Sequence, residues 1–239
     1  MRAASPPLTR RRRLLVLATC CLSLFVVGID AMAVNLALPS IRAQLGASPT
    51  QLQWVVDAYV LVLASLLLLS GSVADRFGRR RVFQLGLVVF GLGSLLCSLA
   101  TSPGALIVSR ALQAVGGSML NPVAMSIITN TFDDPQERAE AIGIWGGTVG
   151  LSMATGPLVG GFLVDAVGWQ AIFWINIPVV LTAAVLAAIL VPESRAARPR
   201  RFDPVGQALL VGLLGGATFA IIEGRVLGWG SPVVLGCLL

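Results

Sequence analysis

Seven long apolar runs constrain the fold of this chain more than any other feature of its sequence. A helix needs roughly 20 mostly apolar residues to cross the hydrocarbon core of a bilayer. The runs cover about 14–38, 52–72, 82–100, 103–129, 139–164, 169–191 and 204–222. Only 12% of the 239 residues are charged, against about 25% in an average soluble domain. We therefore predict an all-α polytopic membrane protein with short loops and no large soluble domain.

The segments before the first predicted span and after the seventh need separate interpretation. Residues 1–13 form a polar leader that ends in four arginines. A basic segment before an apolar run is also typical of secretory signal peptides. The first run is too long for one and contains Asp30 and Asn35, so we interpret it as an uncleaved first helix. An eighth run begins near Ser231 and stops at Leu239, and we expect the chain to be a fragment or a truncated gene product.

Arginine placement predicts the orientation of the chain in the membrane. If successive runs cross the membrane in alternating directions, fourteen arginines lie on the same side of the membrane as the leader. Two, Arg42 and Arg225, lie on the other side. The fourteen lie in the leader, in the loops after the second and fourth runs, and in the loop 192–203. Short cytoplasmic loops carry an excess of basic residues. We therefore expect a multi-pass protein of the cell inner (plasma) membrane whose N-terminus is cytoplasmic.

Composition also excludes several functions. The net charge is +6, but the arginines lie in short loops between apolar runs, where topology accounts for them, so no nucleic-acid partner is expected. There is no histidine, and the four cysteines lie in or beside apolar runs, so we expect neither a metal site nor a disulfide framework. No nucleophile–base pair suggests an enzyme, and no cofactor is expected.

Three charged residues stand out because they lie inside predicted spans. A charge at mid-membrane costs about 2.5–3.5 kcal/mol on insertion scales and marks a bundle interior or an aqueous cavity. Asp30 lies deep in the first run, and we interpret it as a carboxylate that takes up and releases a proton. Burial favours the protonated acid and a nearby cation favours the carboxylate, so a conformational change can drive this step. The alternative is a structural partner for Asn35 or another polar group.

The other two charges are Asp57 and Arg110. Asp57 is shallower, near the start of the second run, where it either binds a cationic substrate or is simply solvated. Arg110 shares a helical face with Gln113 and Gly117, because these positions follow it by three and seven residues. Arginine keeps its proton in proteins, so Arg110 would act as a fixed positive charge that tunes a neighbouring acid. The alternative is a side chain that reaches out from a helix end toward water.

The fifth run carries a stripe of small residues at helical spacing. Small stripes permit close contact between membrane helices, and Pro157 removes one backbone hydrogen bond. The stripe consists of Gly143, Gly147, Gly150, Ala154, Pro157 and Gly161. Close packing alone would explain the stripe, but the cluster Gly156, Pro157, Gly160 and Gly161 is denser than packing requires.

These features together resemble the major facilitator superfamily. The loop after the second run is similar to its signature Gly-x-x-x-Asp-Arg-x-Gly-Arg-Arg, a cytoplasmic gate motif in the family. The matching residues are Gly71, Asp75, Arg76, Gly78, Arg79 and Arg80. The alternative is a basic loop that only sets topology. The fourth run, from Arg110 to Gly117, resembles a motif associated with proton transfer, except that Ala114 stands where the pattern has glycine.

Other segments resemble the fourteen-helix drug:proton antiporters of that superfamily. The fifth run resembles the family's antiporter motif, with Gly146, Gly150, Gly156, Pro157, Gly160 and Gly161. The segments around Asp30 to Pro39, Trp54 to Tyr59 and Trp169 to Pro178 resemble the family's first, second and sixth helices. The likeness covers nearly the whole chain and implies that a C-terminal half of the same protein, with another six helices, is missing.

The resemblance implies domains and roles that we state as expectations. Residues 14–191 would form the six-helix N-terminal bundle, and 204–239 would hold linker helix 7 and the start of helix 8. Asp30, Arg110 and Gln113 would couple protons, while Asp57 and Asn35 would bind a small amphiphilic or cationic substrate that is exported. The alternatives are a nutrient or metabolite symporter on the same fold, or a non-transporting membrane protein made from a half-transporter.

Overall fold

The computed structural model describes residues 8–196 and 203–238, which form helices and no strand. The helices are α1 (Arg10–Leu45), α2 (Pro49–Phe77), α3 (Arg79–Ser98), α4 (Pro103–Thr131), α5 (Pro135–Ala166), α6 (Ala171–Trp174), α7 (Asn176–Leu190), α8 (Pro204–Leu227) and α9 (Pro232–Leu238). Seven stretches are long and apolar enough to cross a membrane, α6 and α7 together forming one of them. The prediction of an all-α chain with seven spans is confirmed.

Four of the long helices begin with the same local signal. A serine or aspartate caps the helix by accepting a backbone N–H, and proline follows in the first helical turn, where its missing N–H costs nothing. The pairs are Ser48–Pro49 for α2, Ser102–Pro103 for α4, Asp134–Pro135 for α5 and Asp203–Pro204 for α8. Because these caps lie at or beyond the edges of the apolar runs, several helices begin earlier than the runs predicted.

Two spans differ from the prediction in ways that the sequence explains. The first helix extends beyond 14–38 at both ends, since Thr9 caps it and Gly46, with φ 64°, ends it in the left-handed conformation. The sixth span is broken between α6 and α7, at Ile175. Pro178 lacks the N–H that would bond to the carbonyl of Trp174, and its ring crowds that carbonyl, which accounts for the break.

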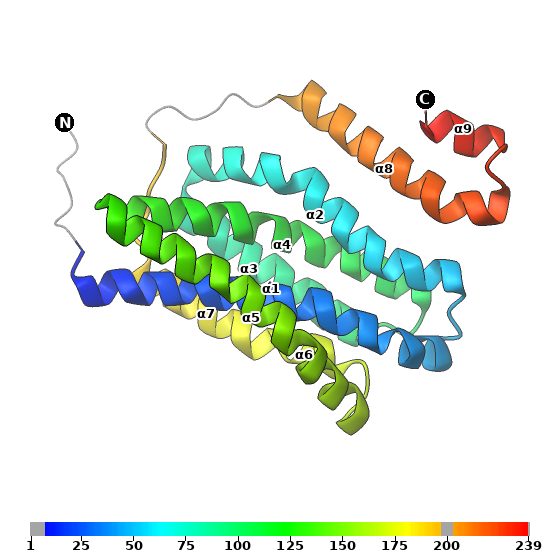
Figure 1. The fold of residues 1–239 in the computed structure, drawn as a ribbon, viewed down its shortest axis with the longest axis horizontal. Coiled ribbons are helices and arrows are strands. Elements are labelled where there is room, and N and C mark those ends of the chain that lie inside the picture. The colour runs from blue at the N-terminus through cyan, green and yellow to red at the C-terminus, as the bar shows by residue number, and fades with distance from the viewer. Residues whose placement is uncertain (1–7, 197–202, 239) are drawn as a thin grey trace.

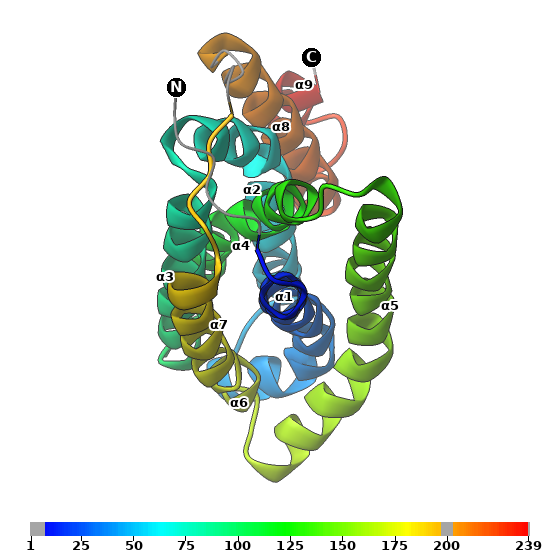
Figure 2. The ribbon, with the colours of Figure 1, turned by 90° about the vertical axis from the view of Figure 1, so that its left-hand side faces the viewer.

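Helix α1 runs through the middle of the bundle. It packs most extensively against α5 and also contacts α4 and α7, while α4 lies against both α2 and α3. Figure 1 shows α1 running along the length of the bundle, and Figure 2 shows α5 on one side of it and α3 with α7 on the other. Helix α8 lies outside this group against α2, and α9 folds back on α8. Side chains on the inner faces of α1 and α4 are therefore buried between helices.

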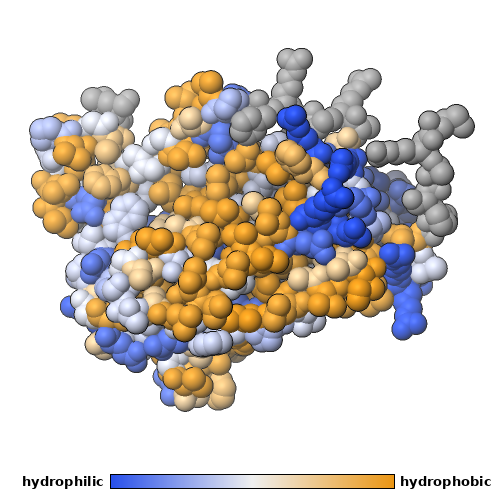
Figure 3. Space-filling model, turned by 180° about the vertical axis from the view of Figure 1, so that it is seen from behind, coloured by the Kyte–Doolittle hydropathy of each residue, from blue (hydrophilic) through white to orange (hydrophobic). Residues whose placement is uncertain are grey.

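The outer surface of the bundle is largely apolar. Large hydrophobic side chains such as Val108, Leu158, Phe162 and Leu209 are at least two-thirds exposed. Figure 3 shows a broad hydrophobic surface across the middle of one face, with the most hydrophilic side chains gathered toward one end. A soluble protein rarely exposes so much contiguous apolar surface. Together with the seven spans, this surface identifies a multi-pass membrane protein.

Four of the arginines on which the predicted orientation depends lie outside the described residues. The prediction of a cytoplasmic N-terminus counted Arg2, Arg198, Arg200 and Arg201, none of which the structure describes. Leu239, where the expected eighth span stops, also lies outside them. The predicted orientation therefore stays a prediction.

Candidate functional site

A cluster of polar side chains is buried where α1, α3, α4 and α7 meet. Its centre is Asp30 of α1, whose side chain is fully buried, and Arg110 of α4, which is 1% exposed. Gln113, Ser94 and Asn176 complete the cluster together with Tyr59 of α2, which lies against Arg110, and all four are at most 2% exposed. A buried charge is tolerated only when it is paired and hydrogen-bonded, so the partners of Asp30 and Arg110 decide what this cluster can do.

The Asp30 carboxylate accepts hydrogen bonds from three side chains on two other helices. Its Oδ2 lies 2.5 Å from Nη1 of Arg110, in an ion pair. Its Oδ1 accepts from the amides of Gln113, at 2.9 Å, and Asn176, at 2.7 Å. All three partners donate, so both carboxylate oxygens are hydrogen-bonded inside the bundle.

The Arg110 guanidinium is held on several sides at once. Beside the Asp30 bond, its Nη1 donates to Oε1 of Gln113 at 2.7 Å, and its Nε donates to the Val55 carbonyl at 3.4 Å. The guanidinium carbon lies 4.0 Å from the centroid of the Tyr59 ring and 5.8 Å from that of Phe173. Cation–π contacts of this kind stabilise a desolvated cation. The positive charge is therefore fixed in place inside the bundle.

Close approach of α3 and α4 lets the cluster form. A Cβ atom at Gly93 would lie 2.5 Å from Cα of Gln113, and one at Gly116 would overlap the backbone nitrogen of Phe90. Only glycine permits such an approach between the two backbones. The short distance lets Oγ of Ser94 accept from Gln113 at 2.7 Å and from Asn176 at 3.0 Å. Ser94 thus links the two amides that hold Asp30.

Two buried polar atoms in the cluster make no hydrogen bond to any described residue. They are the hydroxyl of Tyr59 and Oδ1 of Asn176. A buried polar group without a partner is uncommon and calls for an explanation. Asn176 therefore keeps a buried acceptor, and Tyr59 a buried hydroxyl, that no described side chain uses.

The structure brings together the three residues that the sequence predicted to couple protons. Asp30, Arg110 and Gln113 contact one another directly. The alternative that Asp30 pairs with Asn35 is wrong, because the Asn35 side chain is exposed and donates to the Ala31 carbonyl of its own helix. A structural role of Asp30 with other polar groups stays open, since it contacts Arg110, Gln113 and Asn176. Arg110 does not reach out toward water, because it is buried and paired.

Three members of the cluster were not predicted as site residues: Ser94, Asn176 and Tyr59. Asn176 was noted only as part of the resemblance around the sixth helix, and Tyr59 only in that of the second. The available signal was a polar side chain inside an apolar run, which is costly unless it is paired. Spacing along one helix could not identify their partners, because these lie on other helices.

The two predicted substrate-binding residues lie away from this cluster and from each other. Asp57 is half-buried on α2 and lines a cavity between α2 and α8. Asp57 and Tyr59 point to opposite sides of α2, since residues two apart on a helix differ by about 200°. Asn35 is exposed on α1. The structure thus brings neither Asp57 nor Asn35 to Asp30.

The predicted gate motif forms a tight turn between α2 and α3. Gly78 has φ 114°, a conformation that side chains rarely allow. Nη2 of Arg79 lies 2.9 Å from Oδ1 of Asp75 in an ion pair across this turn. Gly71 lies farther up α2, near Pro122 of α4, and Arg76 is exposed. Arg79 is buried, and two of its nitrogens, Nε and Nη1, have no described partner.

Glu193, which the sequence analysis did not single out, holds the segment after α7 against this turn. Its Oε1 accepts from the Arg80 backbone N–H at 3.2 Å, and its Oε2 lies 3.6 Å from Nε of Arg81. Two backbone bonds reinforce the contact, one from Arg79 to the Ser194 carbonyl and one from Ala196 to the Asp75 carbonyl. The signal available was an acid just after the sixth span, on the side predicted to hold the basic loops.

The α5 motif divides into two faces. Gly156 and Gly160 pack on α1, where a Cβ would lie 2.6 Å from Met32 and 2.9 Å from Ala33. The glycines Gly143, Gly146, Gly147, Gly150 and Gly161 have no described neighbour within 4 Å of such a Cβ. Pro157 is exposed. The predicted stripe therefore makes no close helix contact within the described part of the chain, and α5 packs on α1 through the adjacent face instead.

The sequence of this chain matches a known protein family. The sequence model of the Major Facilitator Superfamily matches residues 20–239. The chain is 42% identical over 214 residues to the puromycin resistance protein of Streptomyces alboniger, covering 90% of this chain and 42% of that protein. It is 38% identical over 221 residues to the multidrug resistance protein Stp of Mycobacterium tuberculosis, covering 92% and 41%. The chain thus spans about two fifths of the length of these relatives.

Solved structures agree on the fold. The POT family transporter PepTSo superposes with a TM-score of 0.70 at 17% identity, over 97% of this chain and 52% of that one. A bacterial homologue of the lysosomal transporter Spinster superposes with a TM-score of 0.61 at 21% identity, over 96% and 59%. With a matching family model over most of its length and relatives near 40% identity, the chain belongs to the major facilitator superfamily.

Proposed function

We propose that this chain forms the N-terminal half of a fourteen-helix, proton-coupled antiporter that exports amphiphilic small molecules across the plasma membrane. Proteins named for resistance to, or export of, puromycin, tetracenomycin C and methylenomycin A are among its relatives. Export rather than uptake is supported by those names and by the resemblance of α5 to the antiporter motif. The further helices, the substrate and the coupling ion all belong to the proposal.

The observation that carries the proposal is the buried pair of Asp30 and Arg110. A carboxylate buried this deeply in a membrane bundle is costly unless its partner stays in place. A proton on Asp30 removes the attraction, whereas Arg110 keeps its own charge. The pair therefore has two arrangements, bound when Asp30 is ionised and released when it is protonated. Such a two-state element is what a transporter needs in order to couple proton binding to a change of conformation.

In this mechanism a proton enters from the outside and neutralises Asp30. Gln113 and Asn176, whose amides donate to Oδ1 of Asp30, would keep the side chain in place. The release of Arg110 frees α4 to move relative to α1. Substrate would bind near mid-membrane between this bundle and the proposed C-terminal one, which is the arrangement of such inverted-repeat transporters. Return of the proton to the cytoplasm would restore the pair.

The turn between α2 and α3 would then act as the cytoplasmic latch. The contacts of Asp75 with Arg79 and of Glu193 with Arg80 and Arg81 tie together the ends of α2, α3 and α7 that lie on this side. Rocking of the bundle as one body requires such ties between helix ends. The free face of α5 would lie toward the second half of the protein.

The test is transport by the natural full-length protein in proteoliposomes. With an imposed pH gradient, the proposal predicts that puromycin or the cationic dye ethidium moves against its own gradient and in the direction opposite to the protons. Nigericin, which collapses the pH gradient, should abolish that movement. Drug movement that is insensitive to nigericin would contradict proton coupling, and proton movement in the same direction as substrate would favour the symporter alternative.

A further inference from the structure

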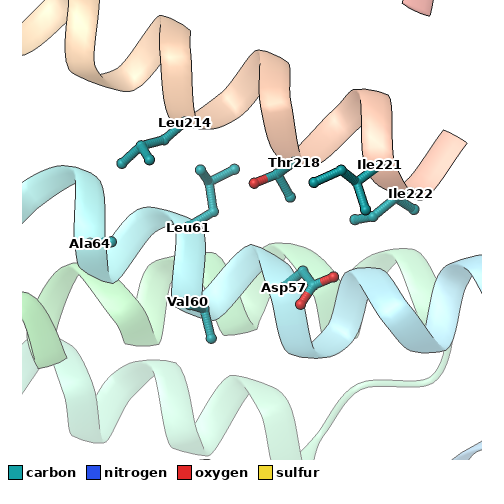
Figure 4. A pocket seen from close by; sticks show the side chains of 8 residues that line it. All are labelled: Asp57, Val60, Leu61, Ala64, Leu214, Thr218, Ile221 and Ile222. Atoms are coloured by element: carbon teal, nitrogen blue, oxygen red, sulfur yellow. The ribbon is translucent and has the colours of Figure 1, made fainter. Parts of the chain in front are cut away.

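A long apolar groove lies between α1 and α5 and plays no part in the cluster around Asp30. It has a volume of about 470 Å³. On α1 its lining runs from Leu14 to Phe25, about 17 Å of helix at 1.5 Å per residue. No charged side chain is among the described residues that line it. The cavity between α2 and α8 differs, because the Asp57 carboxylate lies in its wall (Figure 4).

The groove begins where the close packing of α1 on α5 ends. A Cβ atom at Gly28 would lie 2.1 Å from Oγ of Ser152, so the two backbones are very near each other there. Toward the beginning of both helices, large side chains take the place of this contact, among them Leu17 and Leu22 of α1 and Ile144 of α5. The groove lies over these side chains.

The groove is open to the surface of a membrane span. Leu14 is 48% exposed, and Ile144 and Leu151 are each 56% exposed. Both helices are long and apolar enough to cross a bilayer, so hydrocarbon chains of lipid are the most abundant apolar groups around them. A narrow apolar channel that follows a helix for several turns fits an unbranched hydrocarbon chain.

One end of the groove leads to charged side chains. A small pocket of about 60 Å³ adjoins the groove and shares Leu14, Leu17 and Ile144 with it. Arg10 and Arg13, from the first turn of α1, line this pocket. The apolar channel and the basic turn therefore form one continuous surface.

The charges at this end are not balanced among the described residues. Arg13 pairs with Glu137, and its Nε is buried without a hydrogen bond to any described residue. Arg10 and Arg11 are exposed and make no ion pair with a described side chain, and Glu140 is the exposed acid of the adjoining pocket. Basic pockets between membrane helices attract anionic lipid headgroups.

We propose that the groove between α1 and α5 binds one acyl chain of an anionic phospholipid, whose headgroup lies at Arg10 and Arg11. The phosphate meets the two exposed guanidinium groups, and the chain follows α1 toward Phe25. This inference goes beyond the proposed function, because lipid binding at this place requires no transport. It also places a lipid against α1, the helix that carries Asp30.

The experiment is photolabelling of the natural full-length protein in phosphatidylcholine nanodiscs. The probe is a small fraction of phosphatidylglycerol that carries a diazirine in the middle of one acyl chain. Labelled peptides are mapped by mass spectrometry, and labels in the groove are measured relative to those at Leu181 and Val185, which are exposed on α7. The proposal predicts labels at Leu17–Phe25 of α1 and at Ile144–Leu151 of α5. A phosphatidylcholine probe with the same diazirine chain should label the groove about fivefold less or weaker still, while labelling α7 equally.

Two pairs of variants test the headgroup and the chain separately. Arg10→Gln combined with Arg11→Gln should lower groove labelling by phosphatidylglycerol to the phosphatidylcholine level, whereas Arg10→Lys with Arg11→Lys should retain it. Arg42→Gln, at an exposed arginine near the other end of α1, is the control for the loss of charge.

The chain is tested by filling the groove. Ala18→Trp places a large side chain in it and should reduce labelling by both lipids. Ala105→Trp, at an exposed alanine of α4, is the matched control and should leave groove labelling unchanged.

Three results would overturn the proposal. Equal groove labelling by the two lipid probes in wild type would remove the preference for an anionic headgroup, as would unchanged labelling in the double glutamine variant. Labels at Leu181 without any in the groove would mean that another part of the protein covers it. Because the assay does not measure transport, none of these results depends on the proposed function or decides it.

Discussion

The guanidinium of Arg110 lies 4.0 Å from the centroid of the Tyr59 ring while the same side chain pairs with Asp30. Tyr59 is the single tyrosine of the chain, and its buried hydroxyl has no described partner. The ring therefore contributes to the cluster through its face, and the hydroxyl adds no hydrogen bond that the structure describes. Arg110 is held from α1 by charge and from α2 by an aromatic surface.

This relationship predicts different outcomes for two substitutions of Tyr59. Tyr59→Phe keeps the ring face and removes an unpaired hydroxyl, so transport and thermal stability should stay close to wild type. Tyr59→Leu removes the cation–π contact, which is worth about 0.5–2 kcal/mol, and should lower both. Thermal unfolding in detergent and drug uptake into proteoliposomes measure the two effects. Equal loss in Tyr59→Phe and Tyr59→Leu would assign the role to the hydroxyl instead.

The buried ion pair predicts a non-additive result for stability. Asp30→Leu or Arg110→Leu alone leaves one charge buried without its partner and should destabilise the protein by about 3–5 kcal/mol. The double variant removes both charges and should be less destabilised than either single variant. A double-mutant cycle on thermal unfolding measures the coupling. Additive losses would show that the two side chains do not depend on each other.

Transport in the same three variants should behave differently from stability. Each of them lacks either the acid that binds the proton or the cation that responds to it, so drug movement driven by a pH gradient should be absent in all three. Recovery of stability without recovery of transport would separate the structural role of the pair from its proposed role in coupling. Transport by the double variant would argue against that role.

Close approach of α3 and α4 predicts a large effect at Gly93. A Cβ there would lie 2.5 Å from Gln113 Cα, so Gly93→Ala should force the helices apart and cost about 1–3 kcal/mol. The displaced Gln113 should also impair transport. Gly104→Ala is the matched control, because a methyl group at that glycine of α4 would meet no described atom within 4 Å. Similar unfolding temperatures for Gly93→Ala and wild type would show that the contact is looser than described.

The contact of Glu193 with the turn between α2 and α3 predicts a change in hydrogen exchange. The Arg80 amide donates to Glu193, and a hydrogen bond to a charged group is worth about 1.5–3 kcal/mol. Glu193→Ala should therefore speed exchange of this amide by about tenfold or more. Glu140→Ala, at an exposed acid of α5, is the control and should leave it unchanged. Unchanged exchange in Glu193→Ala would mean that the segment after α7 does not hold the turn.

Much of the fold could be predicted from the sequence because the bilayer restricts the choices. Apolar runs of spanning length specify helices, and short loops between them leave few arrangements. Helix ends were less predictable, because capping residues such as Ser48 and Asp134 lie outside the apolar runs. The break at Ile175 was not predicted within the run 169–191, although Pro178 accounts for it in the structure.

The candidate site was predictable in part. Asp30 and Arg110 stood out because a charge inside a span is costly, and Gln113 because it shares a helical face with Arg110. Ser94 and Asn176 were not identified, because their role depends on which way α3 and α7 face, and a single helix does not reveal its neighbours. The stripe on α5 shows the same limit: its small residues were evident, but not which of the two faces packs on α1.

The most direct test of the account is drug-driven proton movement in Asp30→Asn, compared with wild type. The natural full-length protein is reconstituted with a pH-sensitive dye inside the vesicles, and a gradient of ethidium is imposed. Wild type should move protons against the drug flow. Asp30→Asn, which keeps the shape of the side chain, should move none, while exchange of labelled for unlabelled ethidium across the membrane continues. Proton movement at the wild-type rate in Asp30→Asn would contradict the claim that this carboxylate couples protons to transport.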